Sequence, residues 1–268
     1  MGKKWVHLLF AAVLLLALTQ PAFAQKLPLA QPGILTYGVA ATFPPFEYQE
    51  GDKLVGFDIE LGDALAKKMG LKASPLNMEF KGLIPALQGK RIDIINSAMY
   101  IKPERAEQVD FIPYLKVGEE VMVKKGNPKK VPGVDDLCGK SVAVTLGAIE
   151  EIYARDFSKK CTEAGKAAID VKTFPTAPDS VTAVQQDRSD AFFTSTPGAS
   201  HILQQKPNDF EIVGKSFDAN TQIGMAVRKG DSAMKKAVEE ALMALVKDGT
   251  FDKLRIKYKL PDTVVIVK

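Results

Sequence analysis

The stretch VGFDIELGDALAKKMG, from Val55 to Gly70, decides the fold class because it predicts a helix with one apolar face and a defined end. Apolar residues recur in it at intervals of four, which places them on one side of an α-helix: Phe57, Leu61, Leu65 and Met69. Gly70 stands where helices commonly stop. The run ILTYGV (Ile34–Val39) upstream is typical of a strand, so the two segments predict one βα unit.

The same alternation continues to the end of the chain in two series. The first series adds a strand in KASPLNM, a helix in GLIPALQGK and a strand in RIDIINSA. The second begins with a strand at Glu119–Lys124 and continues with SVAV, a helix in AIEEIYARDF, IDVKTF, a helix ending near Asp187, and the strand DAFF. The strand QIGMAV then precedes a helix over 231–247, which Gly249 closes, and a short helix in TFDKLRIKY. Strands alternating with helices predict an α/β fold, and two series predict two lobes.

The N-terminus predicts an export signal over residues 1–24. Lys3 and Lys4 form a basic start, Leu8–Leu18 is apolar, and Ala22–Ala24 fits a small-x-small cleavage site. The apolar run is shorter than the roughly 20 residues that span a bilayer, which disfavours a permanent anchor. No cysteine lies near the cut, so we expect a periplasmic protein without a lipid anchor, beginning with a proline-containing tail over 25–33.

Composition excludes several partners. The chain has 36 Lys+Arg and 32 Asp+Glu, and loss of Lys3 and Lys4 with the signal leaves a net charge of about +2. Acids and bases are interspersed, whereas nucleic acid and anionic lipid require clustered positive charge, so neither partner is expected. The 46% hydrophobic content of the chain suffices for one large domain or two smaller cores.

The two cysteines, Cys138 and Cys161, predict a disulfide in an oxidising compartment, where such a bond is worth about 3 kcal/mol. The alternative is two buried thiols, because sequence separation does not show that the side chains meet. The only histidines are His7 and His201, and the cysteines lack metal-site spacing, so no metal, cofactor or catalytic triad is predicted.

Loops at the carboxyl ends of the predicted strands are the candidate site, because ligands bind there in open α/β sheets. In AATFPPFEY, Pro44 and Pro45 stiffen the loop and hold Phe43 over a cleft, although Phe43 could equally belong to the core. The second loop offers Phe80.

The third loop, NSAMYIKPER, is the richest in chemistry. It presents Ser97, the backbone N–H groups of Ala98 to Tyr100, and Arg105, whose planar fork suits a carboxylate. The alternative for Arg105 is a surface salt bridge to Glu107 or Asp110.

Several blocks occur together in one order: GVAATFPPFEY, VGFDIELGDALAKKMG, FKGLIPALQGKRIDI, PERAEQVDF, VAVTLGAIEE and RSDAFFTSTP. The chain thereby resembles the extracellular solute-binding proteins, family 3, over essentially its whole mature length. The resemblance implies a two-lobed type II clamshell of mostly parallel sheets flanked by helices, which works with an ABC permease in polar amino-acid import. It implies lobe 1 over 34–114 plus 222–268, lobe 2 over 119–216, and hinges at 115–118 and 217–221. We expect a monomer.

The resemblance also assigns site residues. Phe43 and Phe80 would flank the ligand, Ser97 and the Ala98 amide would contact its polar end, and Arg105 would bind its carboxylate. Across the cleft, the turn Thr145–Ile149, including Gly147 and Ala148, opens a helix whose N–H groups would complete the carboxylate site.

Four positions depart from the family pattern. Ser195 and Ala40 stand where members that bind α-amino acids often have aspartate, and Ala148 and Tyr100 stand where hydroxyl residues are common. An unpaired buried ammonium typically costs 2 to 5 kcal/mol. One hypothesis is therefore a ligand without an α-amino group, such as a keto acid, and the other is that Glu150 or another acid replaces the missing partner. Tyr100 could favour an apolar ligand portion or only shrink the pocket.

Two other functions compete with transport. Some family members act as periplasmic dehydratases on small carboxylates, but the predicted cleft loops offer no histidine and no evident carboxylate pair, so we expect a protein that is not an enzyme. The second alternative is a ligand-sensing partner of a receptor.

Overall fold

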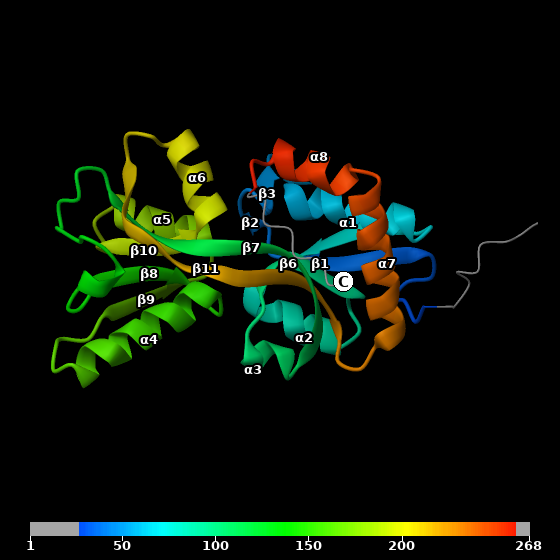
Figure 1. The fold of residues 1–268 in the computed structure, drawn as a ribbon, viewed down its shortest axis with the longest axis horizontal. Helices are drawn as coiled ribbons and strands as arrows, with labels where there is room; N and C mark the ends of the chain where they lie inside the picture. Colours follow the sequence, from blue (N-terminus) through cyan, green and yellow to red (C-terminus); the bar gives the residue numbers. More distant parts are fainter. Residues whose placement is uncertain (1–26, 261–268) are drawn as a thin grey trace, which may run out of the picture.

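The computed structural model describes residues 27–260, and the predicted signal and the last eight residues lie outside this range. Figure 1 shows two α/β lobes side by side, joined by two long strands that run through both. These strands are β7 (Val109–Lys124) and β11 (Phe210–Arg228). They pair antiparallel with each other along most of their length, so the joint between the lobes is itself a piece of sheet.

One eight-stranded sheet, in the order β5-β1-β6-β11-β7-β10-β8-β9, extends across both lobes. Its remaining strands are β1 (Ile34–Val39), β5 (Lys72–Asn77) and β6 (Ile94–Tyr100) in lobe 1, and β8 (Ser141–Thr145), β9 (Asp170–Phe174) and β10 (Ala191–Ser195) in lobe 2. β5, β1 and β6 are parallel, as are β9, β8 and β10. The predicted α/β class with mostly parallel sheets is therefore confirmed.

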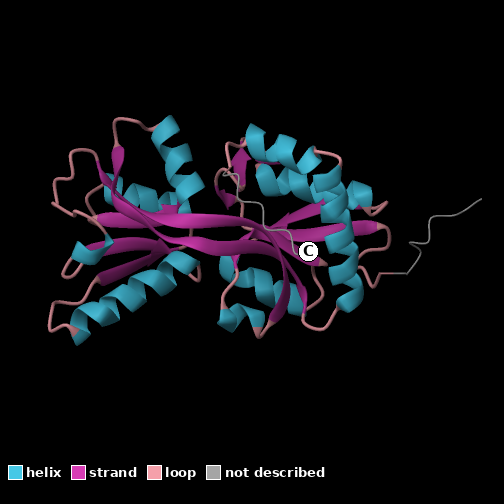
Figure 2. Ribbon diagram, viewed as in Figure 1, coloured by secondary structure: helices cyan, strands magenta, loops and turns pink. Residues whose placement is uncertain are grey.

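Helices cover both faces of the sheet in each lobe (Figure 2). Lobe 1 has α1 (Phe57–Lys68), α2 (Leu83–Gln88), α3 (Pro103–Ala106), α7 (Ser232–Lys247) and α8 (Thr250–Lys257). Lobe 2 has α4 (Ile149–Glu163), α5 (Ala177–Gln185) and α6 (Thr196–Gln205). Two 3₁₀ turns, Phe80–Gly82 and Val134–Asp136, complete the helical structure of the described residues.

Four segments differ from the sequence-based expectation. The predicted strand Glu119–Lys124 is the last part of β7, and the predicted strand QIGMAV is part of a longer strand, β11, that begins at Phe210. The helix α6 had no counterpart in the prediction. The loop AATFPPFEY contains part of a small antiparallel sheet made of β2 (Thr42–Phe43), β3 (Glu47–Glu50) and β4 (Lys53–Val55).

Each lobe has two apolar cores, one on each face of its sheet. In lobe 1 the larger core packs α1, α7 and α8 against one face of the sheet, and the smaller packs α2 against the other. The predicted face of α1 is buried at Phe57, Leu61 and Leu65. Gly62 lies against the Tyr37 ring, where a Cβ would come within 2.6 Å of a ring carbon, so α1 approaches β1 more closely than any larger residue would permit.

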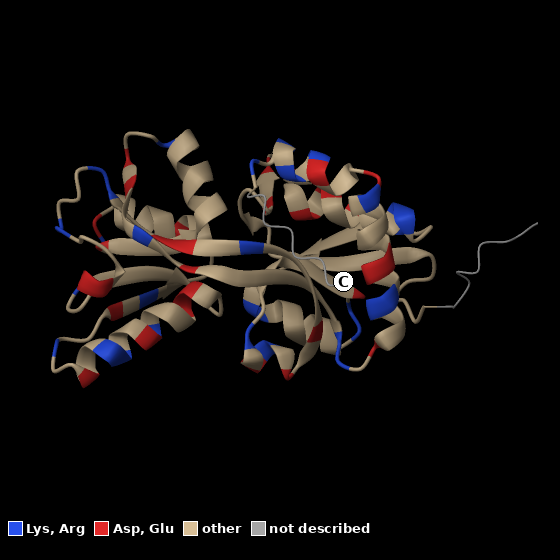
Figure 3. Cartoon of the chain, in the orientation of Figure 1, with Lys and Arg blue, Asp and Glu red and all other residues tan. Residues whose placement is uncertain are grey.

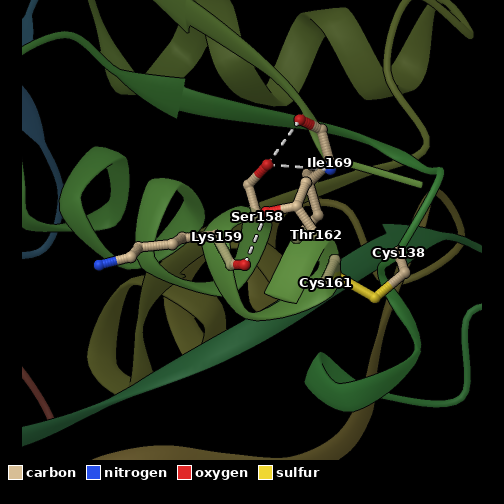
Figure 4. Close-up of a disulfide and its surroundings, with 6 residues drawn as sticks. All are labelled: Cys138, Ser158, Lys159, Cys161, Thr162 and Ile169. Carbon is tan, nitrogen blue, oxygen red and sulfur yellow. Dashed lines mark hydrogen bonds between the residues drawn. A yellow bond between two sulfur atoms is a disulfide. The ribbon is translucent and has the colours of Figure 1, made fainter. Parts of the chain in front are cut away.

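In lobe 2, α4 covers one face, and α5 and α6 cover the other. Cys161 on α4 is bonded to Cys138 in the loop before β8, which confirms the predicted disulfide (Figure 4). On the same helix, the Ser158 hydroxyl accepts a hydrogen bond from the Ile169 amide at 3.0 Å (Figure 4). The end of α4 is therefore held by a covalent bond to the loop before β8 and by a hydrogen bond to the chain entering β9.

Charged residues of both signs alternate over the two lobes (Figure 3). Within residues 27–260, no helix is long and apolar enough to cross a membrane.

Candidate functional site

A cavity lies between the lobes, beyond the carboxyl ends of strands from both. Lobe 1 lines it with Ala40, Thr42, Phe43, Glu47, Phe80, Ala98 and Tyr100, and lobe 2 with Thr145, Ala148, Ile149, Glu150 and Ala177. Seven of the residues predicted for the site are among these: Phe43, Phe80, Ala98, Tyr100, Thr145, Ala148 and Ile149. The other four, Ser97, Arg105, Gly147 and Ser195, do not line this cavity.

The wall from lobe 1 rests on a buried hydrogen-bond network. The Ser97 hydroxyl donates to Glu47 Oε1 at 2.7 Å and accepts from the Ala40 amide at 2.9 Å. The Ala98 amide donates to Asp58 Oδ2 at 2.6 Å, and the Tyr114 hydroxyl donates to the same carboxylate at 2.9 Å. The two groups that were expected to bind the ligand, the Ser97 hydroxyl and the Ala98 amide, are therefore engaged within the protein.

Glu47 and Asp58 are carboxyl groups that interact in the interior, and we call them the carboxyl pair. Burial, together with the neighbouring Asp58 charge, raises the pKa of Glu47 well above its usual range. Burial also raises the pKa of Asp58, to about 7, although the Ala98 amide and the Tyr114 hydroxyl act in the opposite direction. The pair therefore holds a proton more strongly than two exposed carboxyl groups would.

Arg105 lies behind the cavity and connects the lobes. Only 7% of it is exposed. Its guanidinium donates to the Tyr100 carbonyl at 2.9 Å and, across the interface, to the Gly147 carbonyl at 3.0 Å, and it lies 5.3 Å from the centre of the Phe80 ring. These contacts use only part of its five-donor fork, so the guanidinium retains capacity for an anion.

Lobe 2 contributes the start of α4. The predicted turn leads into a helix whose first residue is Ile149, with Ala148 as the N-cap residue. Glu151 accepts a hydrogen bond from the Gly147 amide at 2.8 Å. Burial raises the pKa of Glu150 to about 7, while its own amide and the nearby Arg105 act in the opposite direction.

Glu119 is a further buried carboxyl group, close to Tyr100. Glu119 on β7 is fully buried, and neither of its oxygens has a hydrogen-bond partner among the described residues. Burial raises its pKa well above the usual range, and the Glu150 charge adds to this effect. Ser195, which pairs with Glu119 across the sheet, caps α6 by accepting from the Gly198 amide at 3.1 Å.

Direct contacts hold the lobes together at the edge of the cavity. Lys102 of lobe 1 donates to the Tyr153 hydroxyl on α4 at 2.8 Å and to Asp218 on β11 at 3.2 Å. The same ammonium lies 4.6 Å from the centre of the Tyr153 ring. The structure is thus a closed form of the two lobes.

Sequence reasoning missed three lining residues: Thr42, Glu47 and Ala177. Glu47 carried a readable signal, because it is a charged residue between Phe46 and Tyr48 in a loop that also has two prolines. Thr42 and Ala177 carry no chemical signal, and only the folded chain brings them to the cavity. Ala40, which stands where an aspartate was expected, and Glu150, which was considered as a replacement for it, both line the cavity.

Comparison with known proteins gives one consistent result. The family model for bacterial extracellular solute-binding proteins, family 3, matches residues 35–261. The chain is 31% identical to the L-cystine-binding protein TcyJ of Escherichia coli (strain K12), with 96% of each chain covered. It is 34% identical to the arginine-binding extracellular protein ArtP of Bacillus subtilis (strain 168), over 96% of this chain and 98% of that protein.

A solved structure of an ancestral arginine-binding protein bound to arginine superimposes with a TM-score of 0.77. The two sequences are 40% identical, and the superposition covers 84% of this chain and 98% of the ancestral protein. The architecture is therefore that of a two-lobed binding protein.

Proposed function

Because the chain belongs to the bacterial extracellular solute-binding proteins, family 3, we propose that it captures an amino acid or a related small carboxylate and delivers it to an ABC importer. The observation that carries this proposal is the cavity enclosed by residues from both lobes. A ligand that contacts both walls favours the closed form in proportion to its extra contacts there. The relatives are named as binding proteins, which supports capture rather than turnover.

The carboxylate of the ligand binds between Arg105 and the start of α4. Arg105 contacts Tyr100 and Phe80, which line the cavity, and the helix presents free amides with a partial positive charge. Phe43 and Phe80 flank the ligand, and Tyr100, Thr145, Ala148 and Ile149 complete its contacts.

Ser97, Ala98, Gly147 and Ser195 hold these groups in place from behind the wall or through their backbone.

The ligand carries an α-amino group. The aspartates expected at the positions of Ala40 and Ser195 are missing, but Glu47 and Glu150 line the cavity. Glu150 lies near Arg105, and the α-carboxylate and α-ammonium of an amino acid share one carbon, so Glu150 suits the ammonium. Glu150 therefore takes the place of the absent aspartates, and its carboxyl group favours an amino acid over a keto acid as the ligand.

The protein acts outside the cytoplasmic membrane. Residues 1–24 direct export, and the lobes, 34–114 with 222–260 and 119–216, move about 115–118 and 217–221. Both of these segments lie within β7 and β11, where the lobes are joined.

A thermal-shift screen of the mature protein tests this function. The twenty L-amino acids and matched 2-oxo acids are added at millimolar concentration, and a ligand at a hundred times its dissociation constant stabilises by about 2.7 kcal/mol. Stabilisation by at least one amino acid, and by none of the oxo acids, is expected. A response only to oxo acids contradicts the role of Glu150, and no response to either class contradicts the proposed function.

A further inference from the structure

An apolar groove, here called the α5–α6 groove, adjoins the ligand cavity on the far side of Phe43. Residues of α5, α6 and β10 form it in lobe 2, and Phe43 and Pro44 border it from lobe 1. Helices α5 and α6 cover the same face of the sheet here (Figure 1). Its lining is mainly apolar: Val181, Phe192, Phe193 and Ile202. Thr42, Phe43 and Ala177 line both the groove and the cavity, so the two spaces meet there.

The two spaces differ in size. The ligand cavity has a volume of about 30 Å³. A single water molecule needs about 10 to 15 Å³ of such space, so the cavity holds about two waters. The polar groups of a ligand can replace these waters, but little space is left for a side chain. The α5–α6 groove has a volume of about 220 Å³ and therefore offers the room that the cavity lacks.

The groove also has the chemistry of a site for an apolar side chain. None of the described residues that line it is an aspartate or a glutamate. Two of them can carry a positive charge, His201 and Lys206, and Lys206 donates to Gln185 at 3.2 Å. A cationic side chain in the groove would therefore meet cations and no carboxylate. An apolar side chain would leave water for apolar walls, which is favourable in proportion to the area buried.

The space beyond the other aromatic residue of the cavity is different. Phe80 also lines a second hollow, of about 60 Å³, together with Glu79, Lys81, Leu146 and Pro175. Glu79 and Lys81 are exposed and pair with each other at 3.1 Å. This hollow is smaller and has charged residues at its edge, so it suits a short polar side chain. The direction past Phe43 is the one that suits a long apolar chain.

Resting on the proposed function, we propose that the ligand site extends past Phe43 into the α5–α6 groove and selects an amino acid with a long apolar side chain. The carboxylate and ammonium bind in the cavity at Arg105 and Glu150, and the side chain passes between Phe43 and Ala177. Phe43 belongs to lobe 1, whereas α5 and α6 belong to lobe 2. A side chain in the groove therefore contacts both lobes and favours the closed form.

Isothermal titration calorimetry with unbranched L-amino acids of increasing length tests this extension. The series runs from L-alanine through L-norvaline and L-norleucine to L-2-aminooctanoic acid. L-lysine has the carbon chain of norleucine and ends in an ammonium, so it is the charged comparison. We expect the affinity to rise by about twofold to fourfold for each added methylene. Norleucine should bind at least about tenfold more tightly than lysine, because the ammonium of lysine must leave water without finding a carboxylate.

The variant Val181→Phe narrows the groove without altering the cavity, because Val181 lines only the groove. Its affinity for 2-aminooctanoic acid should fall at least about tenfold, which corresponds to the loss of two or more buried methylenes. Its affinity for the shortest amino acid that binds should stay within about twofold of the original. Ile212→Phe adds the same ring at an apolar position of lobe 2 that is 37% exposed, and it is the matched control. Thermal unfolding of each variant verifies that it folds.

The outcomes separate the inference from the function on which it rests. An affinity that does not rise with chain length, or tighter binding of lysine than of norleucine, overturns the inference. Both are measured on the unaltered protein, so they decide the matter even if Val181→Phe does not fold. An equal loss for short and long amino acids in Val181→Phe also overturns it. Binding of short or polar amino acids alone leaves the proposed function intact, whereas binding of no amino acid removes the function and the inference together.

Discussion

The two walls of the cavity are built differently. The wall from lobe 1 is a network of buried side chains in which Glu47, Asp58, Ser97 and Tyr114 bond one another and the Ala98 amide. The wall from lobe 2 consists of Thr145, Ala148 and Ala177 together with Ile149 and Glu150 in the first turn of α4. Lobe 1 thus offers a preorganised hydrogen-bonded surface, and lobe 2 adds the start of α4 with the Glu150 carboxyl group.

The lobes are also stabilised differently. The larger core of the molecule, around α1, α7 and α8, belongs to lobe 1, whereas lobe 2 has the disulfide. The wall with the buried hydrogen-bond network therefore belongs to the lobe with the larger core, and the opposite wall belongs to the lobe with the covalent bond.

Arg105→Ala removes the group of lobe 1 that reaches lobe 2. We expect ligand affinity to fall at least about 100-fold, because the carboxylate loses its charged partner and the Gly147 carbonyl loses its donor. Equilibrium binding measures the loss, with Arg91→Ala, an exposed arginine of lobe 1, as the control. Retained affinity in Arg105→Ala would remove Arg105 from the site.

Replacing Cys138 and Cys161 together by serine should destabilise lobe 2 by about 3 kcal/mol, because the bond closes a loop with a sequence separation of 23 residues. Hydrogen exchange should show faster opening of β8 and β9, with β1 and β5 unchanged. Mild reduction of the unaltered protein is the control. Equal loss of protection in both lobes would show that the disulfide supports the whole molecule.

Glu119→Gln should raise the free energy of unfolding at pH 8 by about 1 to 2 kcal/mol, because it removes a fully buried carboxyl group to which no hydrogen bond of normal geometry is made. The folded pKa of Glu119 lies above its unfolded value near 4.5. Its contribution to stability is therefore complete below pH 4.5 and is lost as the pH rises through the folded pKa.

Thermal unfolding of the ligand-free protein between pH 5 and 8 should show the melting temperature decreasing as the pH rises, with a weaker slope in Glu119→Gln. Glu120→Gln is the matched control, because Glu120 accepts hydrogen bonds from Thr196 and Ser216. An unchanged slope in Glu119→Gln would mean that Glu119 does not titrate differently in the folded state.

Lys102→Met has the smallest expected effect. It removes the contacts to Tyr153 and Asp218 that join the lobes, and a partly exposed pair of this kind is worth about 1 kcal/mol or less. Ligand affinity should fall about threefold, mainly through faster dissociation. Lys68→Met, which breaks a pair within lobe 1 to Asp248, should leave affinity unchanged. Equal effects of both variants would argue against a contact specific to closure.

The sequence predicted most of the fold, because local patterns determine it. The spacing of Phe57, Leu61 and Leu65 specified the buried face of α1, and Gly249 marked the end of α7. One exception was β7, in which Pro113 and Gly118 divide an apolar run that continues as one strand. Its continuity depends on pairing with β11, which lies about a hundred residues away and leaves no local signal.

The site could be predicted only at positions where the type of residue indicates its chemical role. Aromatic residues and the α4 turn were located on the cavity, as were Ala98 and Tyr100. The burial of Ser97 was not foreseeable, because its partner Glu47 lies 50 positions away and their meeting depends on the approach of β3 to β6. Whether a polar group faces the ligand or the protein is set by such tertiary partners.

The paired strands β7 and β11 have a thermodynamic consequence. Their register shifts between Val213 and Thr221, so the ladder of backbone bonds is already interrupted at the joint, and regular pairing resumes on both sides. Lobe 2 therefore remains tethered near lobe 1 whether or not a ligand is present. Closure of lobe 2 over a ligand that is already bound to lobe 1 is then an intramolecular step at high effective concentration. Little translational entropy is lost when the cavity closes.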